Sequence, residues 1–458
     1  MSKQGTTIAT SDYAIDLFEG PVLAGSRILA LGGANLPIAR ETDGLWSSPA
    51  AAAVRAPWSY GWWDQDLDAG ITFPNTLSKT DFDNNGSAGT SYSNFVFFTF
   101  GGNLQFGRWG VGAAFDNHQY TLPASGGSSL QASFNRGRVA FARSWLEGQL
   151  MLGIGFRFAS LSIATPQSSG EYSTIFSTSA TGLDLGVICG PVGMPFRLAA
   201  SLHASAKGKI DTASSKVTPD ADGDVVIGGR HIPNRVDLPN EMEFGAAFQI
   251  GPRPLNFYWI DPEIEERALT EEISRRRAER ERKRREAWLA TGADPESPMP
   301  ALEGEELAKW LEEDREFRDV KKTVRKQRKE RYLAVPRRKL LIVTSLLISG
   351  PVDNAVSLES FFSQRVDRSG QTTSFTPRLG LEAEPWHDLM QLRLGSYLEP
   401  SRFSYGHPRI HGTTGLDIKV FPWTMFGLFG EDTYWRIGGV VDGARDYFSF
   451  GGSFGVWH

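Results

Sequence analysis

The sequence lacks the features that define several large classes of protein. It contains one cysteine, Cys189, which excludes an intramolecular disulfide and a cysteine-rich metal site. Its longest apolar run, Leu340 to Ile348, is far shorter than the roughly 20 residues that a helical membrane span requires. The net charge of −5 gives no electrostatic argument for nucleic-acid binding. The first twenty residues contain no apolar h-region, so no signal peptide is expected in the printed sequence.

Motifs of catalysis and metal binding are also scarce. The seven histidines include no His-Glu-x-x-His pair, and the sequence contains neither a Gly-x-Ser-x-Gly motif nor a phosphate-binding loop. We therefore expect no enzyme activity, no cofactor and no metal site. His203 is expected to be a hydrogen-bonded lining residue, and Cys189 an inert small hydrophobe on a lipid-facing side of a strand.

Two acidic stretches partly match calcium-binding loops. "DFDNNG" begins like such a loop at Asp81, but Tyr92 stands at the twelfth position, where a calcium loop has a bidentate glutamate. "DADGD", Asp220 to Asp224, is similar. The favoured interpretation is a turn held by Asx hydrogen bonds, and a calcium site is the alternative.

Charged residues are concentrated in one segment. Residues 261–338 contain 20 acidic and 21 basic residues, and this density sets the segment 252–337 apart as a charged α-helical insert. The pattern predicts two helices, Pro262 to Ala290 and Leu302 to Tyr332, separated by "TGADPESPMP". Apolar positions are sparse, which favours a solvated helical hairpin. The alternative is an arm that docks a periplasmic protein or the cell wall, and the block "VKKTVRKQRKERYLAVPRRK" could contact anionic head groups.

Outside the insert, side chains alternate with a period of two, as in β-strands. In "QLMLGIGFRF" (149–158) every second residue is a large apolar one, and the opposite face carries Gln, Met, Gly and Arg. "FRLAASLHA", "MEFGAAFQI" and the last segment of the chain follow the same rule. A second face of glycine, alanine, serine and isolated charges, over about ten residues, is typical of outer-membrane barrels with a polar interior. Strands of soluble sandwiches are usually nearer five or six residues.

The alternation predicts an all-β fold: an antiparallel transmembrane β-barrel of about fourteen strands, with strands 1–8 in residues 58–251 and strands 9–14 in 338–458. Connections alternate between short turns and long polar loops, the asymmetry that periplasmic turns and extracellular loops show. Several tryptophans lie beside the short turns or the chain end, as in an aromatic girdle at one membrane interface, namely Trp109, Trp145, Trp386, Trp423 and Trp457. The expected strands are centred on 58–73, 92–106, 108–121, 129–145, 148–164, 171–189, 194–206, 240–251, 338–350, 374–384, 388–398, 412–421, 434–442 and 446–457.

The N-terminal segment, residues 1–57, is broken by glycine and proline every few residues and reads as a compact plug rather than a helix. A plug ahead of fourteen strands resembles the FadL-type outer-membrane superfamily, the transporters of long-chain fatty acids and other hydrophobic compounds and related hatch-containing barrels. The residues that carry the resemblance are Gly32, Gly33, Ala34, Asp43, Ser48, Pro49 and Ala50, with Ser48 where the family usually has asparagine. The alternative is a Gly/Pro-rich lead-in loop of a different barrel.

Charged residues on the expected inner face could pair into a network that fixes the hatch. These are Arg157, Asp184, Arg197, Glu243, Arg378, Glu382, Arg393 and Lys419.

The resemblance implies passage of small hydrophobic compounds across the outer membrane of a Gram-negative bacterium. The expected partners are outer-membrane lipid, a hydrophobic small molecule or fatty acid, and a periplasmic protein at 261–338, with no nucleic acid. The alternative function is a non-transporting outer-membrane scaffold whose periplasmic helical arm docks a partner protein or complex. Because a barrel needs export, the resemblance also implies an export signal outside the printed sequence.

The strand count predicts the sidedness of the loops. Protease added to intact cells should cleave the long loop 207–239 and spare the insert, because the insert joins the eighth and ninth strands at the short-turn side. Mapping the fragments by mass spectrometry checks this, and cleavage within 261–338 of intact cells would show that the count is wrong.

Overall fold

The computed structural model describes residues 5–18, 20–55, 59, 61–76, 80–87, 92–125, 127, 129–167, 172–210, 223–336, 338–431 and 433–457. The chain divides into two compact units. The first comprises Met1–Arg55, Gln65–Tyr258 and Arg337–His458, and the second comprises Ala56–Asp64 and Trp259–Pro336.

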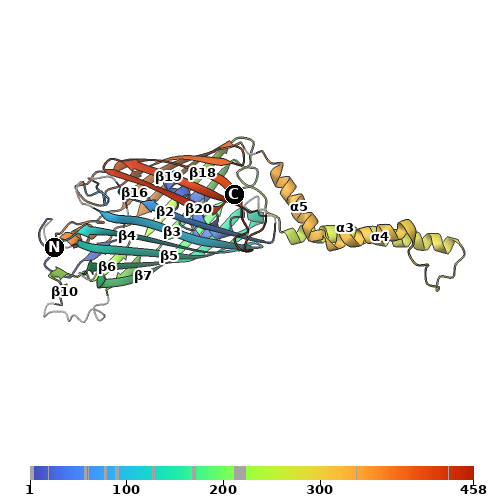
Figure 1. Ribbon diagram of the computed structural model, residues 1–458, viewed down its shortest axis with the longest axis horizontal. Coiled ribbons are helices and arrows are strands. Elements are labelled where there is room, and N and C mark those ends of the chain that lie inside the picture. The colour runs from blue at the N-terminus through green and yellow to red at the C-terminus, as the bar shows by residue number, and fades with distance from the viewer. Residues whose placement is uncertain are drawn as a thin grey trace. The chain divides into compact units, whose positions relative to one another are not determined.

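The first unit is a closed antiparallel barrel, which confirms the predicted fold class (Figure 1). It closes where β2 pairs with β20 and β8 pairs with β13. Among the described residues the barrel has fourteen strands: β2 (Trp63–Phe73), β3 (Ser93–Phe106), β4 (Trp109–Pro123), β5 (Ser129–Trp145), β6 (Leu150–Pro166), β7 (Tyr172–Cys189), β8 (Phe196–His203), β13 (Glu241–Ile250), β14 (Leu340–Ser349), β16 (Ser374–Trp386), β17 (Met390–Glu399), β18 (Arg409–Pro422), β19 (Tyr434–Ala444) and β20 (Tyr447–Val456).

The outer face of the wall is apolar and exposed, as a lipid-facing surface must be. The alternation read from the sequence sets this face: along β6, exposed Leu152, Ile154, Phe156 and Phe158 alternate with inward residues. Other strands expose large apolar side chains in the same phase, among them Phe98, Phe100, Phe141, Leu185, Phe244, Phe248, Leu394 and Ile437. No helix within the described ranges is both long and apolar enough to serve as a membrane span.

Small elements cover the long-loop end of the barrel, where the sequence predicted only polar loops. β1 (Ala14–Asp16) pairs in parallel with β12 (Arg235–Leu238) and β15 (Ala355–Val356), and β9 (Ala206–Lys209) completes this sheet. The hairpin of β10 (Val226–Ile227) and β11 (Arg230–His231) and helix α6 (Leu358–Ser363) belong to the same loops. Residues 211–222 of the loop at 207–239 lie outside the described residues.

The N-terminal segment then runs down through the bore to reach β2 at the short-turn end. It folds as short pieces, α1 (Ser26–Ala30), η1 (Leu36–Ile38), α2 (Glu41–Gly44) and η2 (Pro49–Ala53), all of whose residues are buried. Inward glycines of the wall lie directly against this plug, because a Cβ at Gly110 would overlap the Ala52 carbonyl and one at Gly153 the Ala50 amide. The small second face of the strands therefore serves close backbone contact as well as polarity.

The second unit is helical, with α3 (Pro262–Ala290), α4 (Gly304–Arg318) and α5 (Val320–Leu333). The first predicted helix is confirmed residue for residue, whereas the single helix predicted over Leu302–Tyr332 is wrong. It breaks at Asp319, which ends α4 and precedes α5. The break lets Val320 and Val324 pack on Ile273 of α3, forming the small apolar cluster of this unit.

The close fit of the plug against wall glycines can be tested with a matched pair of substitutions. Gly153→Ala should loosen the plug and raise single-channel conductance in planar bilayers, because the new methyl group overlaps plug backbone. Gly412→Ala is the control, since its Cβ meets nothing within 4 Å. Heat-modifiable mobility in gels verifies that both barrels assemble. Equal conductance of the two variants would contradict close packing of the plug against the wall glycines.

Candidate functional site

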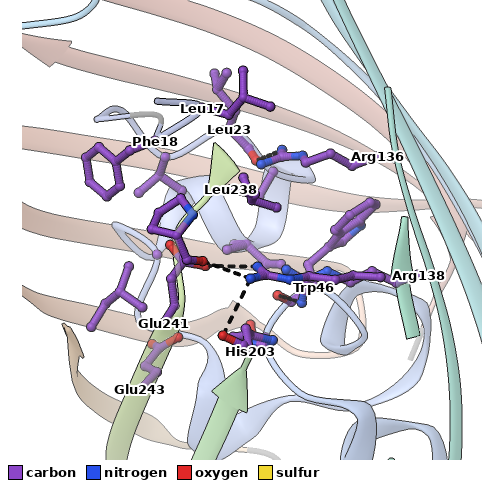
Figure 2. A pocket seen from close by; sticks show the side chains of 18 of the residues that line it. Leu17, Phe18, Leu23, Trp46, Arg136, Arg138, His203, Leu238, Glu241 and Glu243 are labelled. Atoms are coloured by element: carbon purple, nitrogen blue, oxygen red, sulfur yellow. Dashed lines mark hydrogen bonds and ion pairs between the residues drawn. The ribbon is translucent and has the colours of Figure 1, made fainter. Parts of the chain in front are cut away.

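A cavity of about 140 Å³ lies between the plug and the wall on the long-loop side (Figure 2). Its apolar lining comes from the N-terminal segment and β12, and includes Leu17, Phe18, Leu23, Trp46 and Leu238. The opposite side is charged. It presents Arg136, Arg138, Arg157, Arg378, Glu241, Glu243 and His203.

Above the cavity, the long-loop half of the bore is filled by a continuous apolar cluster. It joins inward aromatic and aliphatic side chains of β3 to β7 to the covering loops and the N-terminal segment. Phe361 and Phe362 of α6 are almost completely buried in it, and the Phe361 ring lies edge-on to Phe176 at 5.4 Å between centroids. The cluster includes Ile15, Leu17, Leu23, Phe82, Phe95, Phe97, Tyr120, Leu122, Phe134, Leu161, Ile163, Val236 and Leu238.

Three arginines of the wall connect a wall carboxylate to a carbonyl oxygen of the plug. Arg136 donates to both Asp116 oxygens at 3.0 Å and to the Leu23 carbonyl at 3.4 Å. The Arg138 guanidinium lies 3.8 Å from Asp184 and donates to the Trp46 carbonyl at 2.8 Å. Arg378 pairs with Glu243 at 3.2 Å and donates to the Gly33 carbonyl at 3.4 Å. Each arginine thereby satisfies a plug acceptor that no regular secondary structure serves.

Uncharged polar side chains of the wall also donate hydrogen bonds to plug carbonyls. Gln105 donates to the carbonyls of Ala52 at 3.0 Å and Val54 at 2.8 Å, and Thr413 donates to that of Ala30 at 3.0 Å.

A belt of buried ion pairs lies along one side of the plug, near the short-turn end of the barrel. Lys339 contacts Glu382 at 2.5 Å, Glu382 contacts Arg393 at 2.9 Å, and Arg393 contacts Asp417 at 2.6 Å. Arg436 then bridges the wall to the plug.

The Arg436 guanidinium is shared by three carboxylates. It lies 3.2 Å from Asp417 and 2.5 Å from Asp68 of the wall, and 3.1 Å from Asp43 of the plug. Asp43 is the acidic hatch position identified in the sequence, so this ion pair joins that position directly to β19.

A second polar network connects the plug to a long-loop segment. His411 is fully buried, with Nδ1 2.9 Å from Asp442 and Nε2 2.6 Å from Glu399. Arg409 pairs with Glu399 at 2.6 Å and donates to the carbonyl of Asp81 at 2.5 Å. Tyr397 donates to Asp442 at 2.8 Å and accepts the backbone amide of Val22 of the plug at 3.1 Å.

The remaining hatch residues of the sequence analysis lie in the bore. Gly32 and Gly33 have φ of +60° and +78°, and a Cβ at Gly32 would crowd the Ser396 amide. Ser48 accepts the Ala50 amide at 3.2 Å as the N-cap of η2, with Pro49 at its first position. Ala34 and Ala50 are fully buried.

The structure brings together some members of the predicted charge network and separates others. Glu382 pairs with Arg393, Glu243 with Arg378, and Arg157 with Asp184 at 3.9 Å. The other two residues lie elsewhere.

Arg197 and Lys419 contact no plug carboxylate in the interactions that the structure shows. Arg197 instead donates to Asn256 at 2.9 Å and to the Leu255 carbonyl at 3.1 Å. Lys419 pairs with Asp388 at 2.7 Å in the turn after β16.

Sequence reasoning missed several contributors, among them Arg27, Asp68, Asp116, Arg136, Arg138, Asp417 and Arg436. The inward phase of Arg136 and Arg138 in "FNRGRVAF" was a usable signal.

A Ser-His-Asp connection occurs on the inner wall, although the sequence suggested no nucleophile. His203 Nδ1 lies 2.8 Å from Asp184 and its Nε2 3.3 Å from the Ser201 hydroxyl. His203 borders the cavity, but Ser201 is not among the cavity-lining residues. The arrangement is a hydrogen-bonded part of the wall.

The stretch "DFDNNG" forms a turn through its own side chains. Asp81 accepts the backbone amides of Asn85 at 3.0 Å and Gly86 at 2.8 Å. Asn85 accepts the Ser87 amide, two residues on, at 2.8 Å, which is the Asx hydrogen bond favoured from the sequence. Burial, and then the neighbouring Glu359, raise the pKa of the Asp83 carboxyl well above its ordinary value. In the stretch "DADGD", residues 220–222 lie outside the described residues. Asp224, its last residue, accepts the Ser11 backbone amide at 2.5 Å.

No protein-family model and no curated protein matches the chain. Solved structures align with nearly all of it at low identity. The structure described as the CymD monoaromatic hydrocarbon channel has 7% identity and a TM-score of 0.49, over 95% of this chain and 97% of that chain. A TodX deltaS2S3 mutant monoaromatic hydrocarbon channel has 10% identity and a TM-score of 0.48, over 96% and 99%. A Pseudomonas aeruginosa FadL homologue has 10% identity and a TM-score of 0.44, over 99% and 98%. The likenesses are weak, and the barrel and its plug are established by the strand pairing and buried contacts described above.

The plug anchor at Arg436 can be tested against a peripheral ion pair. Arg436→Gln leaves Asp43, Asp68 and Asp417 buried without their shared cation, which typically costs ~3–5 kcal/mol. We expect frequent plug opening, seen as bursts of higher conductance in planar bilayers. Lys419→Gln removes a pair that does not reach the plug and should behave as wild type. If the assembled Arg436→Gln barrel shows no bursts of higher conductance, Arg436 does not anchor the plug.

Proposed function

We propose that the protein mediates passage of small hydrophobic compounds across the outer membrane of a Gram-negative bacterium. The observation that carries the proposal is the cavity of about 140 Å³ between apolar side chains of the plug segment and charged side chains of the wall. An engineered apolar cavity of ~150 Å³ accommodates benzene, so this volume suits a compound about the size of one aromatic ring.

The arrangement of the bore supports a route that begins at the long loops. Apolar side chains fill the bore from the loop-covered mouth to the cavity, so entry would require the covering loops to move. A hydrophobic compound that entered between these side chains would stay out of water. Below the cavity the plug meets wall glycines and the ion-pair belt. Passage therefore requires displacement of the plug or of its neighbouring wall.

Hydrogen bonds rather than continuous sheet pairing hold the plug, which makes such displacement feasible. Single charged hydrogen bonds contribute ~1.5–3 kcal/mol each, and the arginine contacts to Leu23, Trp46 and Gly33 can break one at a time. These three carbonyls belong to residues that also line the cavity. A compound in the cavity would thus lie next to the bonds that hold the plug.

Filling the cavity should reduce passage. Leu238→Trp places an indole in the cavity, and uptake of radiolabelled toluene by cells producing this variant should fall several-fold relative to wild type. Leu152→Trp, on the lipid-facing wall, is the size-matched control and should retain wild-type uptake. Uptake by wild-type producers no greater than by cells lacking the protein, for both toluene and oleate, would refute the proposed function.

A further inference from the structure

The helical unit carries a positively charged face that its own packing does not use. In residues 320–339 there are ten basic residues and one acidic residue, Glu330, which gives a net charge of 10 − 1 = +9. This block ends immediately before the first residue of β14, Leu340. The segment that follows β13, 251–270, has no such excess, because its acidic residues outnumber its basic ones.

Helix α5 separates these cations into two faces. Its packing face consists of Val320 and Val324, which are buried against Ile273, together with Arg328 and Arg331, which pair with Glu265 of α3 at 3.6 and 2.8 Å. At 100° per residue, a second set of cations falls on the opposite side of the helix. We call it the outer stripe, and it consists of Lys321, Lys322, Arg325 and Lys326.

The outer stripe is accessible to an external ligand. Lys321, Lys322, Arg325 and Lys326 are exposed, and the side chains of Lys322 and Lys326 are 86% and 77% exposed. Two acidic side chains lie near the stripe: Asp319, the residue before α5, is 3.2 Å from Lys322, and Glu330 of α5 is 4.0 Å from Lys326. Such exposed pairs contribute little and leave the stripe strongly positive.

Chain connectivity limits the distance between the end of α5 and the wall of the barrel. Six residues, 334–339, separate the last residue of α5, Leu333, from Leu340, so they span at most ~25 Å. Both strand ends that the insert joins lie at the short-turn end of the barrel, which faces the phospholipid leaflet of an outer membrane. Polybasic segments directly beside a membrane-spanning element are attracted to anionic lipid surfaces.

We infer that the outer stripe of α5 binds the anionic phospholipid head groups of the leaflet around the short-turn end of the barrel. The ligand class is a phosphatidylglycerol-type head group, whose phosphate Lys side chains bind as a point charge and Arg side chains can bind with two parallel hydrogen bonds. Binding there would hold α5 against the membrane and direct the rest of the arm from Asp319 onward. The inference does not depend on what the barrel transports.

The test uses the full-length protein in nanodiscs of two compositions, phosphatidylcholine alone and phosphatidylcholine with about 30% phosphatidylglycerol. Chymotrypsin cleavage after Tyr332, at the end of α5, is compared with cleavage after Phe317 of α4, which serves as the internal reference. We expect phosphatidylglycerol to slow the relative cleavage after Tyr332 about ten-fold, and about 0.5 M salt to remove the difference.

Two variants are compared, and each replaces four exposed basic residues of a helix and removes two exposed ion pairs. The test variant changes Lys321, Lys322, Arg325 and Lys326 to Gln, which removes the pairs with Asp319 and Glu330. The control variant changes Arg275, Arg282, Lys283 and Arg285 of α3 to Gln, and it also removes two exposed helix pairs, those with Glu286 and Glu279. Only the test variant should lose the phosphatidylglycerol effect, while circular dichroism shows unchanged helix content in both.

Three results would overturn the inference. Equal cleavage of the wild type in both discs would show that the stripe has another partner, such as an acidic protein. Loss of protection in both variants would show a diffuse effect of charge, and protection retained in the test variant would show a role for lipid that bypasses the stripe.

Discussion

The structure depends on how an irregular segment is accommodated inside a closed barrel. A strand wall satisfies its own backbone polar groups, but a plug of one-turn helices leaves carbonyls that water does not reach. The wall supplies the missing donors through Arg136, Arg138, Arg378 and Gln105, and it supplies the space through inward glycines. Because the strands provide both the hydrogen-bond donors and the inward glycines, the bore is specific for this plug. The path of the plug in turn determines where empty space remains.

That space lies at the boundary between two different interiors. The short-turn half of the bore is polar and held by ion pairs such as Glu382–Arg393–Asp417, whereas the long-loop half is an apolar cluster. The buried charges from Glu382 to Asp417 are tolerated because each of them has an oppositely charged partner, so their desolvation is offset locally. Neither interior packs fully against the other, and the cavity forms where Trp46 and Leu238 meet the arginines. An amphiphilic lining is thus a consequence of the two-part bore.

The barrel was predictable from sequence because its determinants are local. Alternation along "QLMLGIGFRF" determines which side chains of β6 face outward, and other strands of the wall expose apolar side chains in the same alternating way. Helix α3 was equally predictable, since Asp261 caps it and Pro262 opens it. The break at Asp319 was not, because it arises from contact of Val320 and Val324 with Ile273, some fifty residues away.

The charged site was only partly predictable for the same reason. An inward phase identifies Glu243 and Arg378 as lumen residues, but whether two such residues meet depends on strand register and on the path of the plug. Arg197 has the correct phase and yet contacts Asn256, which lies beyond the end of β13. Asp43 was found through a resemblance, while its partner Arg436 could not be, because 393 residues separate them. The cavity itself leaves no mark in the sequence, since it is bounded by segments that meet only after the barrel closes.

The long insert between β13 and β14 does not disturb the pairing of these two strands. Strands β13 and β14 pair continuously from Glu241 with Ser349 to Ile250 with Leu340, as neighbouring strands joined by tight turns do. The entropy of closing a loop grows only slowly with its length, and the insert also brings its own stabilising contacts. Glu265 near the start of α3 meets Arg331 of α5, whereas Arg276 and Arg284 farther along meet Glu316 and Glu306 of α4. The two halves of α3 carry opposite charges, and each half therefore pairs with a different helix. These ion pairs align α3 antiparallel to α4 and α5, although the apolar cluster of this unit is very small.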